Sequence, residues 1–240
     1  MIDADSEVRH RTQDTAGALL VAMDLRKAFG QSVALDGISV QVNGGEVVAV
    51  LGASGSGKST LLLCLAGIIS PDTGEVRYRG RSLGSLHDAT LTRLRRDEFG
   101  FVFQFGQLVP ELTALDNVSL PLRLAGLRRS DARTRAHEWL ARLDVDDLAD
   151  KRAGEMSGGQ SQRVAVARAL VTGPRVVFAD EPTGSLDSLN GELVMQLLVS
   201  AAREQGTTVI LVTHEALVAA HADREIVIRD GKLARASVAT

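Results

Sequence analysis

Short uninterrupted apolar runs are the clearest pattern along this chain. The strongest lie at residues 46–51, 175–180 and 207–213, where Val, Leu, Ile and Phe dominate. Runs of this length and β-branched content are typical of strands that are buried on both faces of a sheet. A helical segment at residues 191–205 separates the second run from the third, which makes a β-α-β crossover and therefore predicts a parallel sheet.

A second group of strands is expected to pair in an antiparallel sheet beside this core. Turn residues separate its strands: Gly44-Gly45 follows one strand and Pro71-Asp72 precedes another. The strands expected in this group are residues 19–29, 32–42 and 74–79. Farther along the chain, residues 226–229 and 232–236, around Asp230-Gly231, are expected to form a closing hairpin.

Helical periodicity takes over from Phe105. Ser130 is the predicted N-cap of one helix, because serine is among the residues preferred at that position. Trp139 falls on the apolar face of the same helix and is expected to pack in the core. The expected helices are residues 88–96, 115–127, 130–143 and 157–171, and a further strand is expected at residues 99–103.

Composition is that of a globular protein with no internal disulfide framework. The chain has 240 residues, 45% of them hydrophobic, which suffices for one large α/β domain or two small ones. The formal net charge of −3 argues against a dedicated nucleic-acid binder, which usually carries a basic surplus. The single cysteine, Cys64, lies in an apolar helix and is expected to be buried, which fits a reduced, cytosolic setting.

Neither a membrane span nor a signal peptide is expected. The longest apolar runs, such as residues 61–69, fall well short of the roughly 20 residues that a spanning helix needs. Residues 1–18 carry many charges and no apolar segment, so we expect a disordered N-terminal tail. Any link to a membrane would therefore come through a partner.

A glycine-rich segment after the first core strand carries the strongest chemical signal. It matches the phosphate-binding pattern Gly-x-x-x-x-Gly-Lys-[Ser/Thr], and it lies between an apolar strand and an apolar helix. Its backbone N–H groups can surround an anion, Lys58 can reach the β- and γ-phosphates, and the Ser59 hydroxyl can bind Mg²⁺. The alternative is a glycine-rich turn before an ordinary helix. The candidate nucleotide-binding residues here are Gly52, Ala53, Ser54, Gly55, Ser56, Gly57, Lys58, Ser59 and Thr60.

Two acids end the second core strand. Asp180 can hold Mg²⁺ beside Ser59, and Glu181 is then placed to polarise a water for attack on the γ-phosphate. Acid pairs at strand ends are common, so the alternative is a pair of solvated turn residues. In a chain that also has a phosphate-binding loop, this pair indicates metal-assisted hydrolysis of the γ-phosphate.

A third signature precedes the helix at residues 157–171. Its residues are Met156, Ser157, Gly158, Gly159 and Gln160, and its glycines again expose N–H groups at a helix start. With the Ala-Arg-Ala-Leu run that follows, it resembles the signature motif of ATP-binding cassette (ABC) proteins, with Met156 where Leu is usual. The resemblance implies an α/β fold with a P-loop (RecA-like) parallel-sheet core and an antiparallel β subdomain. It also implies a nucleotide-binding domain at residues 19–236, with a helical subdomain inserted at about residues 105–172.

Further cassette elements follow in the expected order. Phe29 matches the aromatic residue that stacks on adenine, although Tyr is commoner there, and Gln104 matches the glutamine that reaches Mg²⁺ and the attacking water. Ser185-Leu186-Asp187 matches the loop that crosses to a second subunit, and His214 matches the histidine that contacts the γ-phosphate and orients the catalytic Glu181. In the family, each subunit's phosphate loop faces the signature of the other. The resemblance therefore implies ATP and Mg²⁺ as cofactors and a second copy of this subunit, in a homodimer.

Two segments indicate which group of ABC proteins the chain resembles. Residues 101–122 and 179–188 are similar to the ATPases of the lipoprotein-release, macrolide-export and cell-division transporters, although Ser185 replaces the usual Asn. The resemblance implies an integral-membrane permease that docks near Phe105 to Leu122, and a peripheral location on the cytoplasmic face of the cell membrane. Ordinary subdomain core is the alternative explanation for part of that stretch.

Two other functions stay open at this point. One is a soluble ABC ATPase acting in DNA repair or translation, which the absence of sustained heptads and of a second cassette disfavours. The other is a regulator that binds nucleotide without hydrolysing it, against which Glu181 and His214 argue. We expect no nucleic-acid partner.

Overall fold

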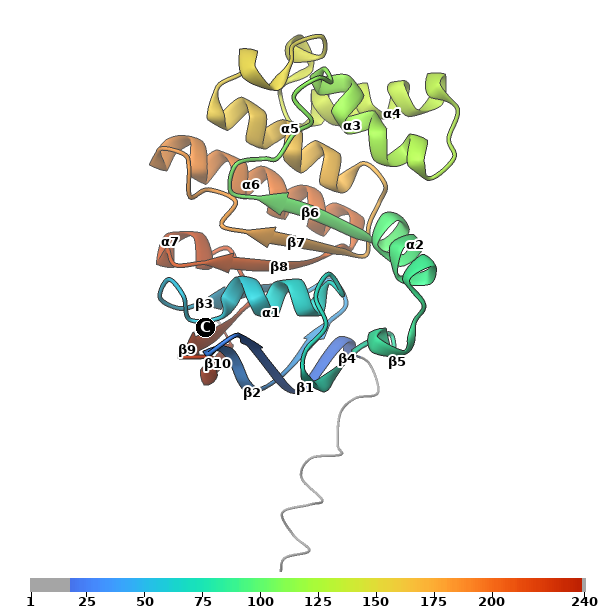
Figure 1. Cartoon of the computed structure of the whole chain (residues 1–240). Coiled ribbons are helices and arrows are strands. Elements are labelled where there is room, and N and C mark those ends of the chain that lie inside the picture. The colour runs from blue at the N-terminus through green and yellow to red at the C-terminus, as the bar shows by residue number, and fades with distance from the viewer. Residues whose placement is uncertain (1–17, 239–240) are drawn as a thin grey trace, which may run out of the picture.

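The computed structural model of this chain describes residues 18–238, and two sheets form its frame (Figure 1). The larger sheet has six strands in the order β10-β9-β3-β8-β7-β6. Strands β9, β3, β8, β7 and β6 run parallel to their neighbours, and only β10 pairs antiparallel, with β9. Its strands are β3 (Val47–Leu51), β6 (Phe99–Phe103), β7 (Val176–Asp180), β8 (Thr208–Thr213), β9 (Arg224–Arg229) and β10 (Lys232–Val238).

The smaller sheet is antiparallel and has the order β2-β1-β4-β5. Its long strands β1 and β2 pair from Ala18↔Asn43 to Phe29↔Ser32, which brings the two strand ends together at Phe29. Its strands are β1 (Ala18–Phe29), β2 (Ser32–Asn43), β4 (Thr73–Tyr78) and β5 (Arg81–Ser82). The predicted combination of a parallel core with an antiparallel sheet is therefore confirmed.

Helices cover both faces of the parallel sheet. One apolar cluster packs α1 between the two sheets, and a second packs α5 and α6 against the opposite face. Figure 1 shows α3, α4 and α5 gathered in one helical layer, with β6, β7 and β8 between that layer and α1. The helices are α1 (Lys58–Leu65), α2 (Asp88–Glu98), α3 (Ala114–Leu124), α4 (Arg129–Arg142), α5 (Gly158–Leu170), α6 (Ser188–Gln205) and α7 (Ala216–Ala219), with 3₁₀ turns at Leu83–Ser85, Asp146–Leu148 and Ala153–Glu155.

One predicted helix start is wrong. Helix α4 has Arg128 as its N-cap and begins at Arg129, so Ser130 lies inside the first turn, where its hydroxyl donates to Asp131. Trp139 packs in the core as predicted, with 8% exposed, and its ring carries the Arg142 guanidinium 4.6 Å from the centroid.

The predicted N-terminal tail and the predicted division into domains are not tested by the described residues. Residues 1–17, most of the predicted tail, lie outside the described residues, and Ala18 already belongs to β1. The division into a domain at residues 19–236 and a helical subdomain at residues 105–172 stays a prediction. Between residues 18 and 238, no helix combines the length and apolar character needed to cross a bilayer.

Cys64 should resist thiol reagents in the native protein. Its side chain is buried in α1, and this burial raises the pKa of the thiol to about 11, so little thiolate forms at pH 8. We expect almost no reaction with an aromatic disulfide reagent in native buffer and one full equivalent in guanidinium chloride, followed by absorbance. Rapid labelling of the native protein would contradict the packing of α1.

Candidate functional site

The phosphate loop joins β3, in the middle of the parallel sheet, to α1. Gly57 is the N-cap of α1, with φ 102°, and no side chain caps the helix. A left-handed backbone of this kind suits glycine and no β-branched residue. The first intrahelical bond runs from Leu61 N–H to the Gly57 carbonyl, which leaves the N–H groups of the first turn free. Together with the helix dipole, those groups form an anion site.

Close backbone packing explains the two outer glycines of the loop. A Cβ on Gly57 would stand 2.1 Å from the Ala34 carbonyl oxygen, and one on Gly52 would stand 2.3 Å from the Ile228 carbonyl oxygen. The Ser56 hydroxyl is buried in the same loop and has no hydrogen-bond partner among the described residues. The loop is thus packed too closely against β2 and β9 for a side chain at Gly52 or Gly57, and the unpartnered Ser56 hydroxyl leaves a buried polar group that a phosphate ligand could satisfy.

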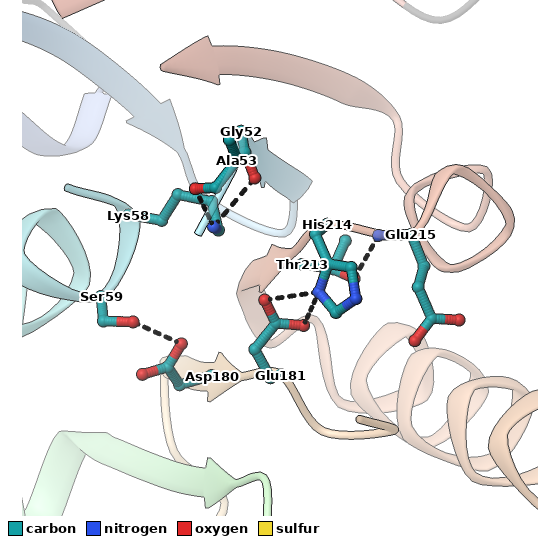
Figure 2. Close-up of polar contacts among 9 residues, drawn as sticks. All are labelled: Gly52, Ala53, Lys58, Ser59, Asp180, Glu181, Thr213, His214 and Glu215. Atoms are coloured by element: carbon teal, nitrogen blue, oxygen red, sulfur yellow. Dashed lines mark hydrogen bonds and ion pairs between the residues drawn. The ribbon is translucent and has the colours of Figure 1, made fainter. Parts of the chain in front are cut away.

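The Lys58 ammonium lies over the loop (Figure 2). It donates to the carbonyl oxygens of Gly52 and Ala53, both at 2.9 Å. An ammonium has three donors, so one remains for an anion bound in the loop. No acidic residue lies in the first turn of α1 to compete for that charge.

Ser59, in the first turn of α1, meets Asp180, the last residue of β7, although 121 residues separate them along the chain. The Ser59 hydroxyl donates to Asp180 at 3.0 Å, as Figure 2 shows. Burial raises the pKa of the Asp180 carboxyl, and the charge of Glu181 adds to this, while Ser59 and Lys58 oppose it. A bound cation would relieve the cost of that buried charge.

Magnesium fits this pair in a limited way. Among residues 18–238, no three His, Cys, Asp or Glu side chains gather to hold a metal. Mg²⁺ is usually held by one or two protein oxygens, with phosphates and water completing its octahedron. Ser59 and Asp180 would supply the two protein oxygens, and the phosphates of the nucleotide would contribute further ligands.

Glu181 and His214 form the second contact that the sequence predicted. His214 Nδ1 lies 3.0 Å from each carboxylate oxygen of Glu181, and Figure 2 shows the ring facing the carboxylate. Glu181 has a left-handed backbone with φ 47°, and its N–H donates to the Val212 carbonyl at 2.9 Å. Such a conformation costs a non-glycine residue about 1 to 3 kcal/mol and often marks a functional position.

Gln104 comes to the same edge of the sheet through β6. Phe103 pairs with Asp180 across β6 and β7, so Gln104 directly follows the register position of the metal-binding candidate. The Gln104 carbonyl accepts a hydrogen bond from the Ser185 hydroxyl at 2.7 Å, and its side-chain amide packs against Gly184. The loop after Glu181 therefore holds Gln104 in place.

The signature residues begin α5, in the helical layer. Ser157 accepts a hydrogen bond from Gln160 N–H, and the Gln160 side chain accepts one from Ser157 N–H, which forms a capping box. The Ser157 hydroxyl keeps its own proton free to donate. Asn190, which the sequence did not single out, packs here: its Oδ1 lies 2.9 Å from where a Cβ on Gly159 would be.

Phe29 ends β1 with 55% of its surface exposed. The Lys27 ammonium lies 5.6 Å from its ring centroid and is itself held by Asp72 at 2.7 Å. A large aromatic ring that is left this exposed, with a cation beside it, offers a stacking surface for a planar base.

Comparison with known proteins agrees with this geometry. The family model described as "ABC transporter" matches residues 35–184, which include the phosphate loop, Gln104, the signature and the Asp180-Glu181 pair. The chain belongs to the ABC transporter family. The predicted family and fold are thereby confirmed, and this cassette is an ATPase.

Relatives of the cassette fall in the predicted group. It is 48% identical over 203 residues to the macrolide export ATP-binding/permease protein MacB of Salmonella choleraesuis (strain SC-B67), covering 85% of this chain and 31% of MacB. It is 43% identical over 220 residues to the lipoprotein-releasing system ATP-binding protein LolD of Geobacter metallireducens, covering 90% of this chain and 98% of LolD. The cassette thus spans about a third of MacB and nearly all of LolD.

A solved structure extends the comparison. The ATP-binding cassette MJ0796, described as a dimer in a post-hydrolysis state bound to ADP and Pi, superposes with a TM-score of 0.84 at 39% identity. The match covers 91% of this chain and 98% of that one.

Proposed function

We propose that this cassette is the ATP-hydrolysing subunit of a transporter, which powers a membrane permease by closing as a homodimer around ATP and Mg²⁺. The observation that carries the proposal is the meeting of Lys58, the Ser59–Asp180 pair and the Glu181–His214 pair at one edge of the parallel sheet. Substrate sites of open α/β sheets lie at this carboxyl edge. The relatives are transporter ATPases, which does not favour a role in DNA repair or translation.

We assign one role to each side chain of the candidate site. Lys58 and the N–H groups of the loop bind the phosphates, and Phe29 stacks on adenine. Glu181 accepts a proton from the attacking water, while His214 holds the carboxylate in place. Ser59, Asp180 and Gln104 would hold Mg²⁺, which would supply positive charge to neutralise the transferring phosphoryl group.

The signature is assigned to the nucleotide of the partner copy. Ser157 and Gly159 start α5 in the helical layer, and strands β6, β7 and β8 lie between that layer and α1 in Figure 1. A second copy could supply its signature to this phosphate loop, and the dimeric state of MJ0796 supports that arrangement. We extend the proposal to export or mechanotransmission, and the names of the relatives, macrolide export and lipoprotein release, support export.

The permease is expected to dock in a groove beside Gln104. This groove, of about 460 Å³, is lined by Phe101, Phe103, Pro121 and Leu124, with Arg95 and Arg168 at its sides. Within the predicted docking stretch, Leu108, Leu115, Val118 and Leu122 are buried, so that part of the stretch is subdomain core, while Phe105 is 74% exposed. This mixed apolar and basic lining suits an amphipathic helix with acidic residues on the cytoplasmic side of a permease.

Leu124→Asp should weaken that docking. Leu124 is 62% exposed in the groove, and a carboxylate there would be desolvated by the partner. We expect at least about a 10-fold loss of permease co-purified from membranes, with basal phosphate release unchanged. Leu193→Asp, at a 40% exposed leucine of α6 outside the groove, is the matched control. Equal recovery of permease with both variants would reject the groove.

Phosphate release with and without the permease tests the function itself. Turnover that needs neither Glu181 nor nucleotide-dependent pairing would contradict it, and so would a chain that binds ATP but never hydrolyses it with its permease present. Tight, salt-sensitive binding to nucleic acid would favour the soluble alternative.

A further inference from the structure

The chain uses the same tight turn twice. Asp230 and Gly231 join β9 to β10 with φ 49° and 72°, between the paired residues Arg229 and Lys232. Arg79 and Gly80 join β4 to β5 with φ 49° and 76°, again between paired residues. Two positive φ values in a two-residue loop define the type I′ hairpin turn, which favours glycine.

The surroundings of the two turns differ. Gly80 is exposed, and a Cβ there would meet nothing within 4 Å. Gly231 is buried, and a Cβ there would stand 3.0 Å from the Ala34 carbonyl oxygen. One turn is a simple connection, whereas the other is packed into the molecule.

Gly231 is bound on both sides through its main chain. Its N–H donates to the Ser56 carbonyl at 3.1 Å, and its carbonyl accepts from Asp36 N–H at 2.8 Å. The Lys232 ammonium also pairs with Asp36, at 3.2 Å. The turn therefore bridges the phosphate loop and β2, although about 175 residues separate it from Ser56 along the chain.

The bond to Ser56 fixes the direction of a peptide group that matters for ligand binding. In a trans peptide, the carbonyl and the following N–H point in opposite directions. Holding the Ser56 carbonyl toward Gly231 therefore turns the Gly57 N–H the other way, away from the hairpin. The same hairpin also brings the Ile228 carbonyl against Gly52, at the other end of the loop.

We propose that the Asp230-Gly231 turn sets the shape of the phosphate loop and that Gly231 is a positioning residue for nucleotide binding. It contacts no reacting atom. It acts by orienting the Ser56–Gly57 peptide, which would otherwise be free to rotate between glycine neighbours.

Gly231→Ala and Gly80→Ala form a matched pair. Both place alanine in the same left-handed backbone, so both carry similar conformational strain, but only the first crowds the Ala34 carbonyl, at 3.0 Å, and so displaces the turn that bonds to Ser56. We expect Gly231→Ala to raise the dissociation constant of Mg-ADP about 5- to 10-fold, as loss of one hydrogen-bonded contact predicts, and Gly80→Ala to stay within about 2-fold of the unmodified chain. Calorimetric titration measures both constants, and melting temperatures without nucleotide verify that both variants fold.

Hydrogen exchange on the unmodified chain gives a second measurement, which decides the matter if Gly231→Ala does not fold. Amides at residues 229–232 should exchange at least about 10-fold more slowly with Mg-ADP bound, while those at residues 78–81 should not change. Equal dissociation constants for the two folded variants would overturn the proposal. Where only exchange can be measured, an unchanged rate at residues 229–232 would overturn it. Neither result would contradict the assignment of this chain as an ATPase, because both experiments start from an unmodified chain that binds nucleotide.

Discussion

Glu181→Gln should reduce steady-state phosphate release by about 10³-fold, within the 10²–10⁴ range of general base catalysis. The amide has the size of the carboxylate and can still contact His214 Nδ1, which lies 3.0 Å from both Glu181 oxygens. It cannot accept a proton from water. ATP binding should be retained, because Lys58, Ser59 and Asp180 are untouched, and the bound ATP should accumulate uncleaved.

Glu215→Gln is the matched control. Glu215 directly follows His214, but its carboxylate points away from the Glu181–His214 pair in Figure 2, and its N–H donates to the Thr213 hydroxyl at 3.0 Å. We expect this variant to hydrolyse ATP at the unmodified rate. A Glu181→Gln protein that turns over normally would remove Glu181 as the base, and a melting temperature no longer raised by Mg-ATP would show that binding was lost instead.

Core strands were predictable because burial on both faces leaves polar residues only at their ends. The residues of β3, β7 and β8 are almost all fully buried, so their runs carry no alternation that could be mistaken for another element. Helix α6 between two such strands then left only a parallel arrangement. The edge at which Ser59, Asp180 and His214 meet follows directly, since parallel strands end on the same side.

Local rules were weaker at helix starts. Serine is a good cap, yet α4 begins one residue before Ser130, at Arg129. The helix is fixed by burial of Ala132, Ala136 and Leu140, and a cap worth about 1 kcal/mol does not shift that face. Ser157, by contrast, caps α5 as part of a capping box with Gln160, where two hydrogen bonds act together.

Contacts between distant segments that belong to no recognisable motif could not be predicted from sequence. The Asp-Gly pair identified a hairpin turn, but nothing in its pattern shows that Gly231 bonds to Ser56. Asn190 against Gly159 and Ser185 on the Gln104 carbonyl are of the same kind. Each depends on where whole elements pack, whereas the motif residues are recognisable because their chemistry requires a fixed local spacing.

Two variants with complementary defects can show whether the signature acts on the nucleotide of its own copy or on that of the partner copy. Lys58→Ala should weaken ATP binding by about 10- to 100-fold, since a charged hydrogen-bond donor is lost. Ser157→Glu keeps a residue compatible with a helix start but places a negative charge where the γ-phosphate of the partner copy would lie. Each variant alone should hydrolyse almost no ATP at concentrations that saturate the unmodified cassette.

Mixing the two variants in equal amounts should restore about a quarter of the unmodified activity, because half of the random pairs are mixed and one of their two sites is intact. That site combines Lys58 from one copy with Ser157 from the other. If the signature served its own copy, every site would keep one defect and the mixture would stay inactive. A chain carrying both substitutions, mixed with the unmodified chain, reverses the outcome: its mixed pairs are inactive when the sites are shared and retain one working site when they are not. Phosphate release from the two mixtures therefore decides between a shared and a self-contained site without any change in the number of defects.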